Sequence, residues 1–403
     1  MSRALSFAAF IAISLAILAG MHWYLWIRLV RDPALAEPWR RILSVAFLVL
    51  TFSVPIAMLA LRLAPRPLDR IVPVAAFTWL GLAFLLFVAV LAFDLARLAA
   101  EGASLALAHL RSLPEPPADP ARRVFVARAL AGAAVAAAAG TSAIAFRSAT
   151  GPAQVSEVPV TLERLPRTLS GFTIAQVSDL HVGPTIGERH VRRIVDQVNA
   201  LRPDLVAITG DLVDGTVAEL GDAVAHLSRL SAPHGVFFVT GNHEYYSGVG
   251  PWLAELRRLG VRVLRNERVV VGDAGASFDL AGVDDWSARG YGGGHGLDLP
   301  AALAGRDPDR SLVLLAHQPR TSAFAEAVRS GVELQLSGHT HGGQIAPWNV
   351  VVAAVFPYVK GLYRHVEDGR AGQVYVSRGA GYWGPPMRLG APPEIAKLVL
   401  AGT

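Results

Sequence analysis

Histidine, aspartate and asparagine side chains recur at the ends of five apolar runs in this chain. The polar stretches are Asp179–His181, Gly210–Asp211, Gly241–Glu244, His317 and Gly338–His341. Short runs rich in Val, Ile, Leu and Phe that stop at Gly or Asp predict buried strands. Ligands of layered α/β folds bind at the carboxyl ends of strands, where the loops converge. Because imidazole, carboxylate and amide groups are transition-metal ligands, the pattern predicts a metal site at that edge.

The spacing inside these stretches suits two metal ions. In an extended segment, Asp179 and His181 lie on one face and can reach the same ion, and His339 and His341 repeat this spacing. Asp211 lies on a predicted turn, where its two oxygens could bridge two ions. Mixed nitrogen and oxygen ligands favour Mn, Zn, Fe or Co over Ca or Mg. Two such ions about 3.5 to 4 Å apart activate a bridging water for displacement at phosphorus, so we expect phosphoester hydrolysis.

Taken in order, these motifs resemble those of the calcineurin-like metallophosphoesterases. The motifs are Asp-x-His at 179–181, Gly-Asp-x-x-Asp at 210–214, Gly-Asn-His-Glu at 241–244, the single His317, and Gly-His-Thr-His at 338–341. The resemblance covers roughly residues 170–400 and implies an α/β domain of two β-sheets flanked by helices, an α/β/β/α sandwich. It also implies a metal-dependent hydrolase of phosphoester bonds. The extension of the last motif to Gln344, with the later Arg388, is similar to the membrane-attached or exported bacterial branch.

The resemblance implies a role for each candidate residue. The implied ligands are Asp179, His181 and His341 for one ion, Asn242, His317 and His339 for the other, and Asp211 as the bridge. His243 is implied as the proton donor or transition-state stabiliser and not as a ligand. The cofactor is therefore a pair of divalent transition-metal ions, with Mn, Zn and Fe as the candidates. Asp214 is either functional or only an anchor of its loop, and Glu244 is expected to orient its neighbours.

The amino-terminal part of the chain is predicted to lie in a membrane. Of the 403 residues, 52% are hydrophobic and 17% charged, and the apolar excess precedes residue 147. The charge-free segments 5–27, 42–61 and 71–93 are each long enough to span a bilayer as a helix. A fourth segment, 124–145, consists mostly of Ala and Gly. It is either a fourth span or a twin-arginine signal that begins at Arg122-Arg123 and is cleaved after Ala145.

These segments predict three parts and an orientation. The parts are a transmembrane helical region (1–146), a tether (147–168) and a metallophosphoesterase domain (169–403). The loops after the first and third predicted spans hold eight arginines near helix ends, against five on the opposite side. Because positive residues stay inside, we expect a multi-pass protein of the cell membrane whose catalytic domain is extracytoplasmic.

The charge pattern argues against a nucleic-acid partner. The formal net charge is +5, but lysine occurs only at 360 and 397, and no basic stripe alternates with aromatic residues. Arg378 and Arg388 are predicted to bind a phosphate group instead. The expected partners are the lipid bilayer and a phosphorylated or lipid-linked small molecule, and the oligomeric state is not predicted.

The leading prediction is a membrane-anchored phosphoesterase in which a metal-bridged hydroxide attacks a lipid-linked or cell-envelope phosphoester or pyrophosphate. Hydrolysis of soluble phosphodiesters is the enzymatic alternative. A third hypothesis makes the hydrolase the regulatory output of a membrane sensor or transporter. The absence of charged residues from the first three predicted spans disfavours that hypothesis, because intramembrane function usually needs polar groups.

Overall fold

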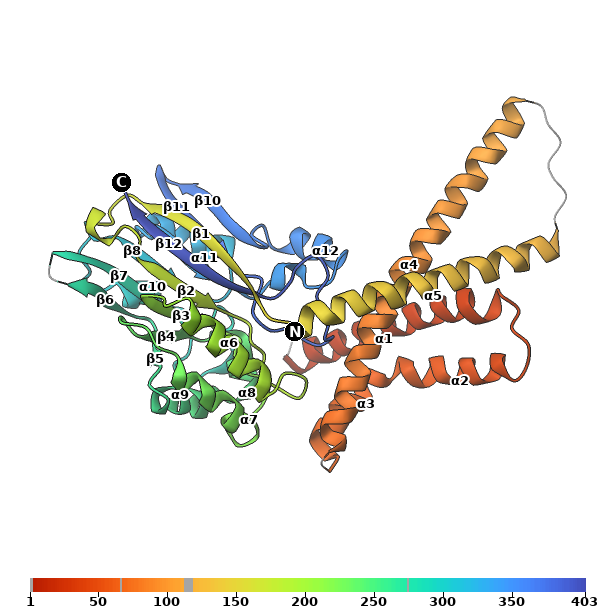
Figure 1. Cartoon of the computed structure of the whole chain (residues 1–403), viewed down its shortest axis with the longest axis horizontal. Coiled ribbons are helices and arrows are strands. Elements are labelled where there is room, and N and C mark those ends of the chain that lie inside the picture. The colour runs from red at the N-terminus through yellow and green to blue at the C-terminus, as the bar shows by residue number, and fades with distance from the viewer. Residues whose placement is uncertain (1–2, 66, 112–118, 274) are drawn as a thin grey trace. The chain divides into compact units, whose positions relative to one another are not determined.

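The computed structural model describes residues 3–403 apart from 66, 112–118 and 274. The chain divides into two compact units, Met1–Ala145 and Phe146–Thr403 (Figure 1). The amino-terminal unit is helical in its described residues. Its elements are α1 (Arg3–Trp26), which continues into a π-helical turn (Ile27–Arg31), α2 (Trp39–Thr51), α3 (Ser53–Leu63), α4 (Leu68–Leu110) and α5 (Pro120–Thr150), whose last turn belongs to the second unit.

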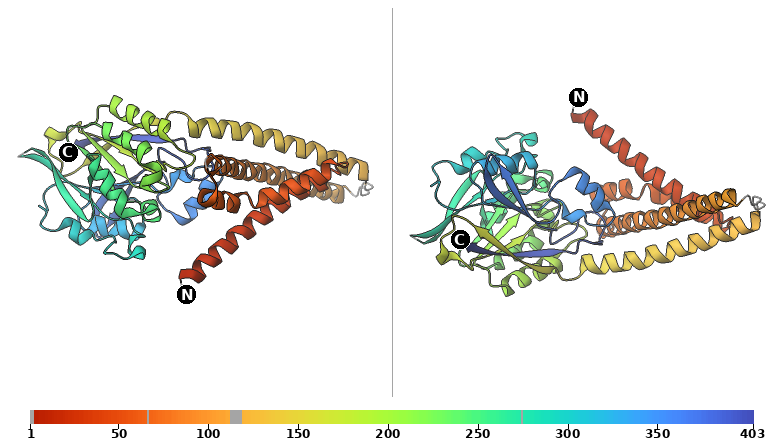
Figure 2. Two further views of the ribbon diagram at one scale, coloured as in Figure 1. Left: turned by 90° about the horizontal axis from the view of Figure 1, so that it is seen from below. Right: turned by 90° about the horizontal axis from the view of Figure 1, so that it is seen from above.

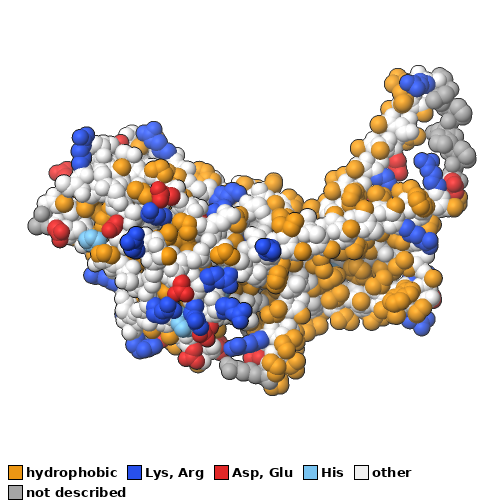
Figure 3. All heavy atoms as spheres, in the orientation of Figure 1, with side chains coloured by type: hydrophobic (Ala, Val, Ile, Leu, Met, Phe, Trp, Pro, Cys, Tyr) orange, Lys and Arg blue, Asp and Glu red, His pale blue; other side chains and the backbone are white. Residues whose placement is uncertain are grey.

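The helical unit has the dimensions and surface of a membrane region. Ile11–Arg31, Leu68–Leu110 and Pro120–Thr150 are each long and apolar enough to cross a bilayer, and α2 with α3 would form a fourth, bent span. These are the three to four helices predicted from the sequence. Small residues of α5, such as Ala134 and Ala138, belong to the same buried cluster as Ala83 and Leu86 of α4, where the two helices cross (Figure 1, with further views in Figure 2). Hydrophobic side chains predominate over charged ones on the face of this unit that Figure 3 shows.

The helices differ from the predicted spans in length and continuity. The predicted span 42–61 is interrupted at Phe52, where α2 and α3 bend by 50°. Pro55 contributes to this bend because it lacks the amide hydrogen that would bond to the carbonyl of Thr51. The predicted span 71–93 is part of the 43-residue α4, because the Ala- and Leu-rich segment up to Leu110 continues the helix. The charged residues Arg28 and Asp94 therefore lie within continuous helical segments.

The second unit contains two six-stranded mixed sheets. The first is ordered β1 (Gln154–Leu162), β12 (Glu394–Gly402), β2 (Thr173–Val177), β3 (Leu205–Thr209), β4 (Val236–Val239), β5 (Arg262–Val263). The second is ordered β10 (Gly361–Glu367), β11 (Arg370–Val376), β9 (Leu334–Ser337), β8 (Leu312–Leu315), β7 (Ala276–Gly282), β6 (Glu267–Asp273). The strands β2 to β5 are parallel to one another, and so are β11, β9, β8 and β7. The five apolar runs of the sequence form β2, β3, β4, β8 and β9.

Helices cover the outer face of each sheet. They are α6 (Glu188–Ala200), α7 (Val217–Val224) and α9 (Val249–Arg258) on the first sheet, and α10 (Leu299–Leu303) and α11 (Thr321–Arg329) on the second. Two further helices, α8 (Asn242–Ser247) and α12 (Trp348–Val355), belong to the segments that follow β4 and β9. In β3, Val206 and Ile208 pack with α6, α7 and α9, whereas Leu205 and Ala207 pack against the second sheet. The run is continuously apolar because both of its faces are buried. The second sheet packs in turn on α10 and α11, so the predicted α/β/β/α sandwich is confirmed.

The segment 147–168, predicted as a tether, contains a strand of the first sheet. In β1, Val158, Val160 and Leu162 alternate with more exposed residues, and the strand pairs in parallel with β12 from Gln154 to Leu162. The sequence prediction missed this strand because β12 is more than 200 residues away in the chain. The carboxyl-terminal strand thereby connects β1 to the strand that leads into the first metal motif.

Candidate metal centre

The two sheets direct their carboxyl-terminal strand ends toward one cluster. Asp179 and His181 follow β2, Asp211 follows β3, Asn242 and His243 begin α8 after β4, His317 follows β8, and His339 and His341 follow β9. All eight candidate residues from the sequence therefore come from strand ends, as the motif pattern required. The first five are supplied by the first sheet and the last three by the second.

The side chains form two groups whose donor atoms could each surround one ion. One group is Asp179, His181 and His341, and the other is Asp211, His317 and His339, with donor atoms within 4.8 Å of one another in each. A third combination of His181, Asp211 and His243 links them. The first group contains the residues implied for one ion, and the second contains His317 and His339 of the other implied set together with the implied bridge Asp211. The geometry is compatible with those roles, and the assignment of each ligand stays a prediction.

Asp211 occupies the position expected of a shared carboxylate. Its Oδ2 lies 3.0 Å from His317 Nε2 in one group and 3.9 Å from His181 Nε2 in the other. Within the first group, His181 Nε2 and His341 Nε2 are 3.1 Å apart, and His341 Nε2 is 3.6 Å from Asp179 Oδ1. His317 Nδ1 donates to the carbonyl of Thr209 at 2.7 Å, which leaves Nε2 as its ligand nitrogen.

Two buried oxygen atoms without a hydrogen-bond partner indicate that the cluster fits metal cations. Asp179 Oδ2 and Asn242 Oδ1 are buried and have no hydrogen-bond partner among the described residues. Burying such atoms unpaired is costly, and a metal ion is one partner that would offset the cost. Burial raises the pKa of Asp179, and the charge of Asp211 raises it further against the opposing effect of His317. The mixed carboxylate, amide and imidazole set suits divalent transition metals.

The backbone is strained at five of the candidate ligands. The φ angles are positive at Asp179 (53°), His181 (50°), Asp211 (50°), His339 (73°) and His341 (51°). Residues with a Cβ pay roughly 1 to 3 kcal/mol for such a conformation, and such residues cluster at functional sites. The extended geometry predicted for residues 179–181 is therefore wrong. The chain instead turns there, because Asp179 N donates to Gly210 O and His181 N donates to Asp211 O, at 3.0 and 3.1 Å.

His243 lies beside the cluster with one ring nitrogen anchored. Its Nδ1 is 2.5 Å from Asp214 Oδ1, and its Nε2 is 3.9 Å from Asp211 Oδ2. Burial lowers the pKa of His243, but the hydrogen bond to Asp214 and the charge of Asp211 outweigh burial and raise it to about 9. His243 can therefore present a protonated Nε2 to a group bound at the centre.

Asp214 also holds His181, so it is more than a loop anchor. Both of its carboxylate oxygens lie 3.2 Å from His181 Nδ1. One carboxylate thus orients a candidate metal ligand and the candidate proton donor together. This role could not be predicted from the sequence, because the spacing of Asp214 from Asp211 does not show which side chains Asp214 contacts.

Glu244 fixes the loops after β3 and β4 to each other. Its carboxylate, which is fully buried, accepts hydrogen bonds from the amides of Gly241 (2.6 Å), Asp211 (3.0 Å) and Leu212 (2.8 Å). The close approach of the loops also requires Gly210, whose φ is 82°: a Cβ there would lie 2.5 Å from Gly241 N. The expectation that Glu244 orients its neighbours agrees with these contacts.

The prediction that Arg378 and Arg388 bind a phosphate group is wrong. The side chain of Arg388 is buried and donates to the carbonyls of His341 (2.9 Å), Arg378 (2.7 Å) and Gly381. Arg378 pairs with Glu394 at 3.0 Å. Because their donors are directed to protein acceptors, Arg388 holds the loop that carries His341, and Arg378 connects to Glu394 of β12 and Ser156 of β1.

Aromatic residues surround the outer side of the cluster. The ring of Trp383 lies 5.7 Å from that of His243, and the ring of Tyr246 lies 5.0 Å from it. Both side chains are well exposed, at 58% and 60%. The ring of Phe356 likewise packs beside the ring of His339, with centroids 5.4 Å apart. Trp383 is therefore open to a ligand at the site, whereas the neighbouring Tyr382 is buried.

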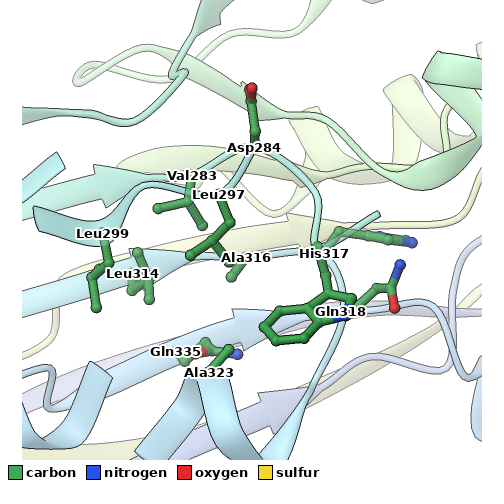
Figure 4. A pocket seen from close by; sticks show the side chains of 11 residues that line it. Val283, Asp284, Leu297, Leu299, Leu314, Ala316, His317, Gln318, Ala323 and Gln335 are labelled. Atoms are coloured by element: carbon green, nitrogen blue, oxygen red, sulfur yellow. The ribbon is translucent and has the colours of Figure 1, made fainter. Parts of the chain in front are cut away.

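A small cavity lies behind His317 and does not serve as a substrate site. Its volume is about 10 Å³, and apolar side chains such as Val283, Leu299 and Leu314 line it (Figure 4). A cavity of this size admits about one water molecule. Trp286 also lines this cavity. The packing here keeps His317 in place at the end of β8.

Asp285 is a buried residue near the centre that the sequence analysis missed. Its Oδ1 accepts a hydrogen bond from Gln318 at 3.0 Å, and its Oδ2 has no hydrogen-bond partner among the described residues. Its charge contributes to raising the pKa of His317. Asp285 follows the apolar strand β7, so the rule that found the other motifs, an acidic residue after an apolar run, would also have found this one.

Comparison with known proteins gives one family. Residues 172–343 match the family model "Calcineurin-like phosphoesterase". The chain is 43% identical over 267 residues to "Transmembrane protein with metallophosphoesterase domain" of Bos taurus, an alignment that covers 64% of this chain and 60% of that relative. It is 34% identical over 250 residues to an uncharacterized metallophosphoesterase of Aquifex aeolicus, covering 62% of this chain and 92% of the relative.

A further relative, an uncharacterized metallophosphoesterase of Helicobacter pylori (strain J99), is 40% identical over 247 residues, which cover 61% of this chain and 64% of the relative. The chain thus spans about 60% of the length of the bovine and Helicobacter relatives.

We expect Asp211→Asn to remove metal from the protein, because a shared carboxylate contributes to both ion sites. The full-length chain would be loaded with Mn, Zn or Fe, dialysed, and analysed for metal content by mass spectrometry. Wild type should retain about two ions per chain, as a two-metal site requires, and Asp211→Asn about one or fewer. Asp309→Asn removes an exposed carboxylate and is the matched control. Equal metal content in wild type and Asp211→Asn would contradict the bridging assignment.

Asp214→Asn should weaken metal binding without abolishing it. A side chain that orients a ligating histidine typically contributes 10- to 100-fold to metal affinity or activity. We therefore expect a metal affinity lower by that factor in titrations against a competing chelator, with about two ions still bound at saturation. Asp222→Asn changes an exposed acid in the same region as a control. If Asp214→Asn binds metal like Asp222→Asn, Asp214 only anchors its loop.

Proposed function

The chain belongs to the calcineurin-like metallophosphoesterases. From that premise we propose that it is a metal-dependent phosphoester hydrolase that acts at a membrane on a lipid-linked or cell-envelope phosphoester or pyrophosphate. The observation that carries the proposal is the placement of Asp211 between two donor groups, with His243 directed at the same point. The first ion would be held by Asp179, His181 and His341, and the second by Asn242, His317 and His339, with Asp211 shared.

Two divalent ions bound here would act as Lewis acids toward a phosphoryl oxygen and lower the pKa of a bound water. The residues of the chain supply the rest. His243 Nε2 would donate a hydrogen bond or a proton to the phosphoryl group or the leaving oxygen, where negative charge develops. Asp214 accepts from His243 Nδ1 and so keeps Nε2 directed toward the centre. Glu244 and Arg388 hold the loops from which these groups project.

The surface around α12 supports an apolar substrate or a membrane-bound one. This helix follows the Gly338–Gln344 motif and has no buried residue. Val350 and Val355 are 67% and 63% exposed, and the next residue, Phe356, contacts His339. An exposed apolar patch of this kind usually marks a binding surface. Together with the exposed Trp383, it offers apolar contacts within reach of the metal centre.

The membrane location rests on the helical unit. Three described helices, and the α2–α3 pair as a fourth, are long and apolar enough to span a bilayer, and the bovine relative is named a transmembrane protein. We infer a multi-pass arrangement in the cell membrane. The excess of arginines around the α1–α2 and α4–α5 connections favours a cytoplasmic position for those connections. On that basis the catalytic domain is extracytoplasmic.

The activity would be measured with the full-length chain in detergent after loading with Mn, Zn or Fe. The substrates are bis(p-nitrophenyl) phosphate, p-nitrophenyl phosphate and a polyprenyl pyrophosphate in mixed micelles. We expect turnover to depend on metal and kcat to fall roughly 100- to 1000-fold in His243→Ala, which should retain its metal. The micellar substrate should have the highest kcat/KM.

The results separate the candidate functions. A higher kcat/KM for bis(p-nitrophenyl) phosphate than for the micellar substrate would favour the alternative, a phosphodiesterase for soluble diesters. Absence of turnover for all three substrates, with two ions shown to be bound, would contradict the proposed substrate class and favour a regulatory output domain.

The orientation can be tested because the natural chain has no cysteine. Two single-cysteine variants would be made at exposed positions, Asp309→Cys in the catalytic domain and Ala36→Cys between α1 and α2. A membrane-impermeant maleimide should label Asp309→Cys in intact cells and Ala36→Cys only after lysis. The reverse pattern would place the catalytic domain in the cytoplasm.

A further inference from the structure

The helical unit contains a charged pocket that the hydrolase does not use. It is a cavity of about 350 Å³, within the size range of small-molecule sites. Its charged lining, which we call the arginine pocket, is Arg28, Arg31, Asp32, Asp94, Arg97 and Arg123. The remaining wall is apolar and includes Val90, Phe93 and Leu130. Charged side chains gather at one end of the helical unit in Figure 3.

The two aspartates of the pocket are already paired. Arg28 Nε lies 2.7 Å from Asp94 Oδ2, and Arg28 Nη1 donates to Asp32 at 2.8 Å. Arg31 pairs with the other oxygen of Asp32 at 2.9 Å. The hydroxyl of Tyr24 donates a hydrogen bond to Asp94, which is largely buried. Because these carboxylates are neutralised by Arg28 and Arg31, they do not compensate the other two arginines.

Arg97 and Arg123 supply positive charge that the two aspartates of the pocket do not neutralise. Arg97 Nε is buried and has no hydrogen-bond partner among the described residues, and its contact with Glu101 is long, at 3.9 Å. Arg123 forms no ion pair with a residue that the structure describes. Four arginines against two aspartates leave the pocket positive. The bias of positive residues toward one side of a membrane explains arginines near helix ends, but it does not explain a buried guanidinium nitrogen without an acceptor.

The backbone holds the pocket in shape. Ile27–Arg31 forms a π-helical turn, in which Asp32 N donates to Ile27 O at 2.9 Å. Such turns are frequent at functional sites, and this one carries Arg28 and Arg31. Arg128 of α5 donates to the carbonyl of Pro33 at 2.8 Å, which ties α5 to the loop after the π-helical turn. Arg123 and Arg97 are thereby kept at the same cavity from two different helices.

We propose that the arginine pocket binds an anionic phosphate group, carried either by a membrane phospholipid or by a soluble phosphoester. The planar guanidinium groups of Arg97 and Arg123 match the geometry of phosphate oxygens. Basic pockets between transmembrane helices bind phosphorylated lipid headgroups, and the apolar wall formed by Val90, Phe93 and Leu130 suits the adjoining glycerol and acyl carbons. The site is separate from the metal centre and does not depend on its activity.

The full-length chain would be purified in a zwitterionic detergent and examined by native mass spectrometry after addition of phosphatidic acid, phosphatidylglycerol or phosphatidylcholine. Glycerol 3-phosphate and inorganic phosphate form a second arm, read by thermal stabilisation. The test variant is Arg97→Gln with Arg123→Gln. Its matched control is Arg122→Gln with Arg70→Gln, which removes two exposed arginines that do not line the pocket. Elution volume and Tm without ligand show that each variant is folded.

We expect wild type and control to retain an anionic phospholipid at least about tenfold more than phosphatidylcholine, and the test variant to lose about tenfold of that retention. Loss of stabilisation by glycerol 3-phosphate in the test variant alone would also support the site and assign it to a soluble ligand. Equal retention in the test and control variants would overturn the proposal. Equal binding of phosphatidylcholine, or no binding in either arm, would overturn it as well.

Discussion

Negative charge held inside the catalytic domain is the constraint on which the rest of that domain depends. Asp179 and Asp211 are almost completely buried and lie within one cluster of imidazoles, and the Oδ2 of Asp179 has no hydrogen-bond partner among the described residues. Such a cluster is unfavourable by itself, because burial penalises charge and the two carboxylates repel each other. Divalent cations relieve both effects. Folding of this region and binding of its metal ions are therefore expected to be coupled.

The surrounding residues maintain this arrangement against the preferences of the backbone. Five candidate ligands have positive φ angles, a conformation that persists only when many contacts enforce it. The carboxylate of Glu244 accepts hydrogen bonds from three amides of two loops. The buried Arg388 donates hydrogen bonds to carbonyls of the loops that carry His341 and Gly381. Two charged side chains thus act as internal connectors of loops. Their charges are offset by backbone dipoles, which is why neither is available to a substrate.

The helical unit also holds charged side chains in apolar surroundings. Its exposed side chains are mostly apolar, yet the largely buried Asp94 pairs with the half-buried Arg28 and accepts from Tyr24, inside continuous helical segments. A charged pair in such surroundings is expensive and usually functional. The sequence disfavoured a polar role for this unit because the predicted spans ended at residues 27 and 93, one residue before Arg28 and Asp94 respectively. The helices continue past both positions, and the polar contacts lie in those continuations.

The sequence determined the strands that carry the metal motifs, the layered fold and the set of residues at the centre. It could do so because apolar periodicity and strand-end ligands are local properties of the chain. Only the tertiary structure decided which side chains meet: that Asp214 holds both His181 and His243, that Arg388 serves His341 and not a substrate, and that β1 joins β12. These contacts bring together residues 29 to 240 positions apart, and local patterns carry no information about such pairings. The strained ligand backbone likewise arises from contacts between loops, so it could be found only in the folded chain.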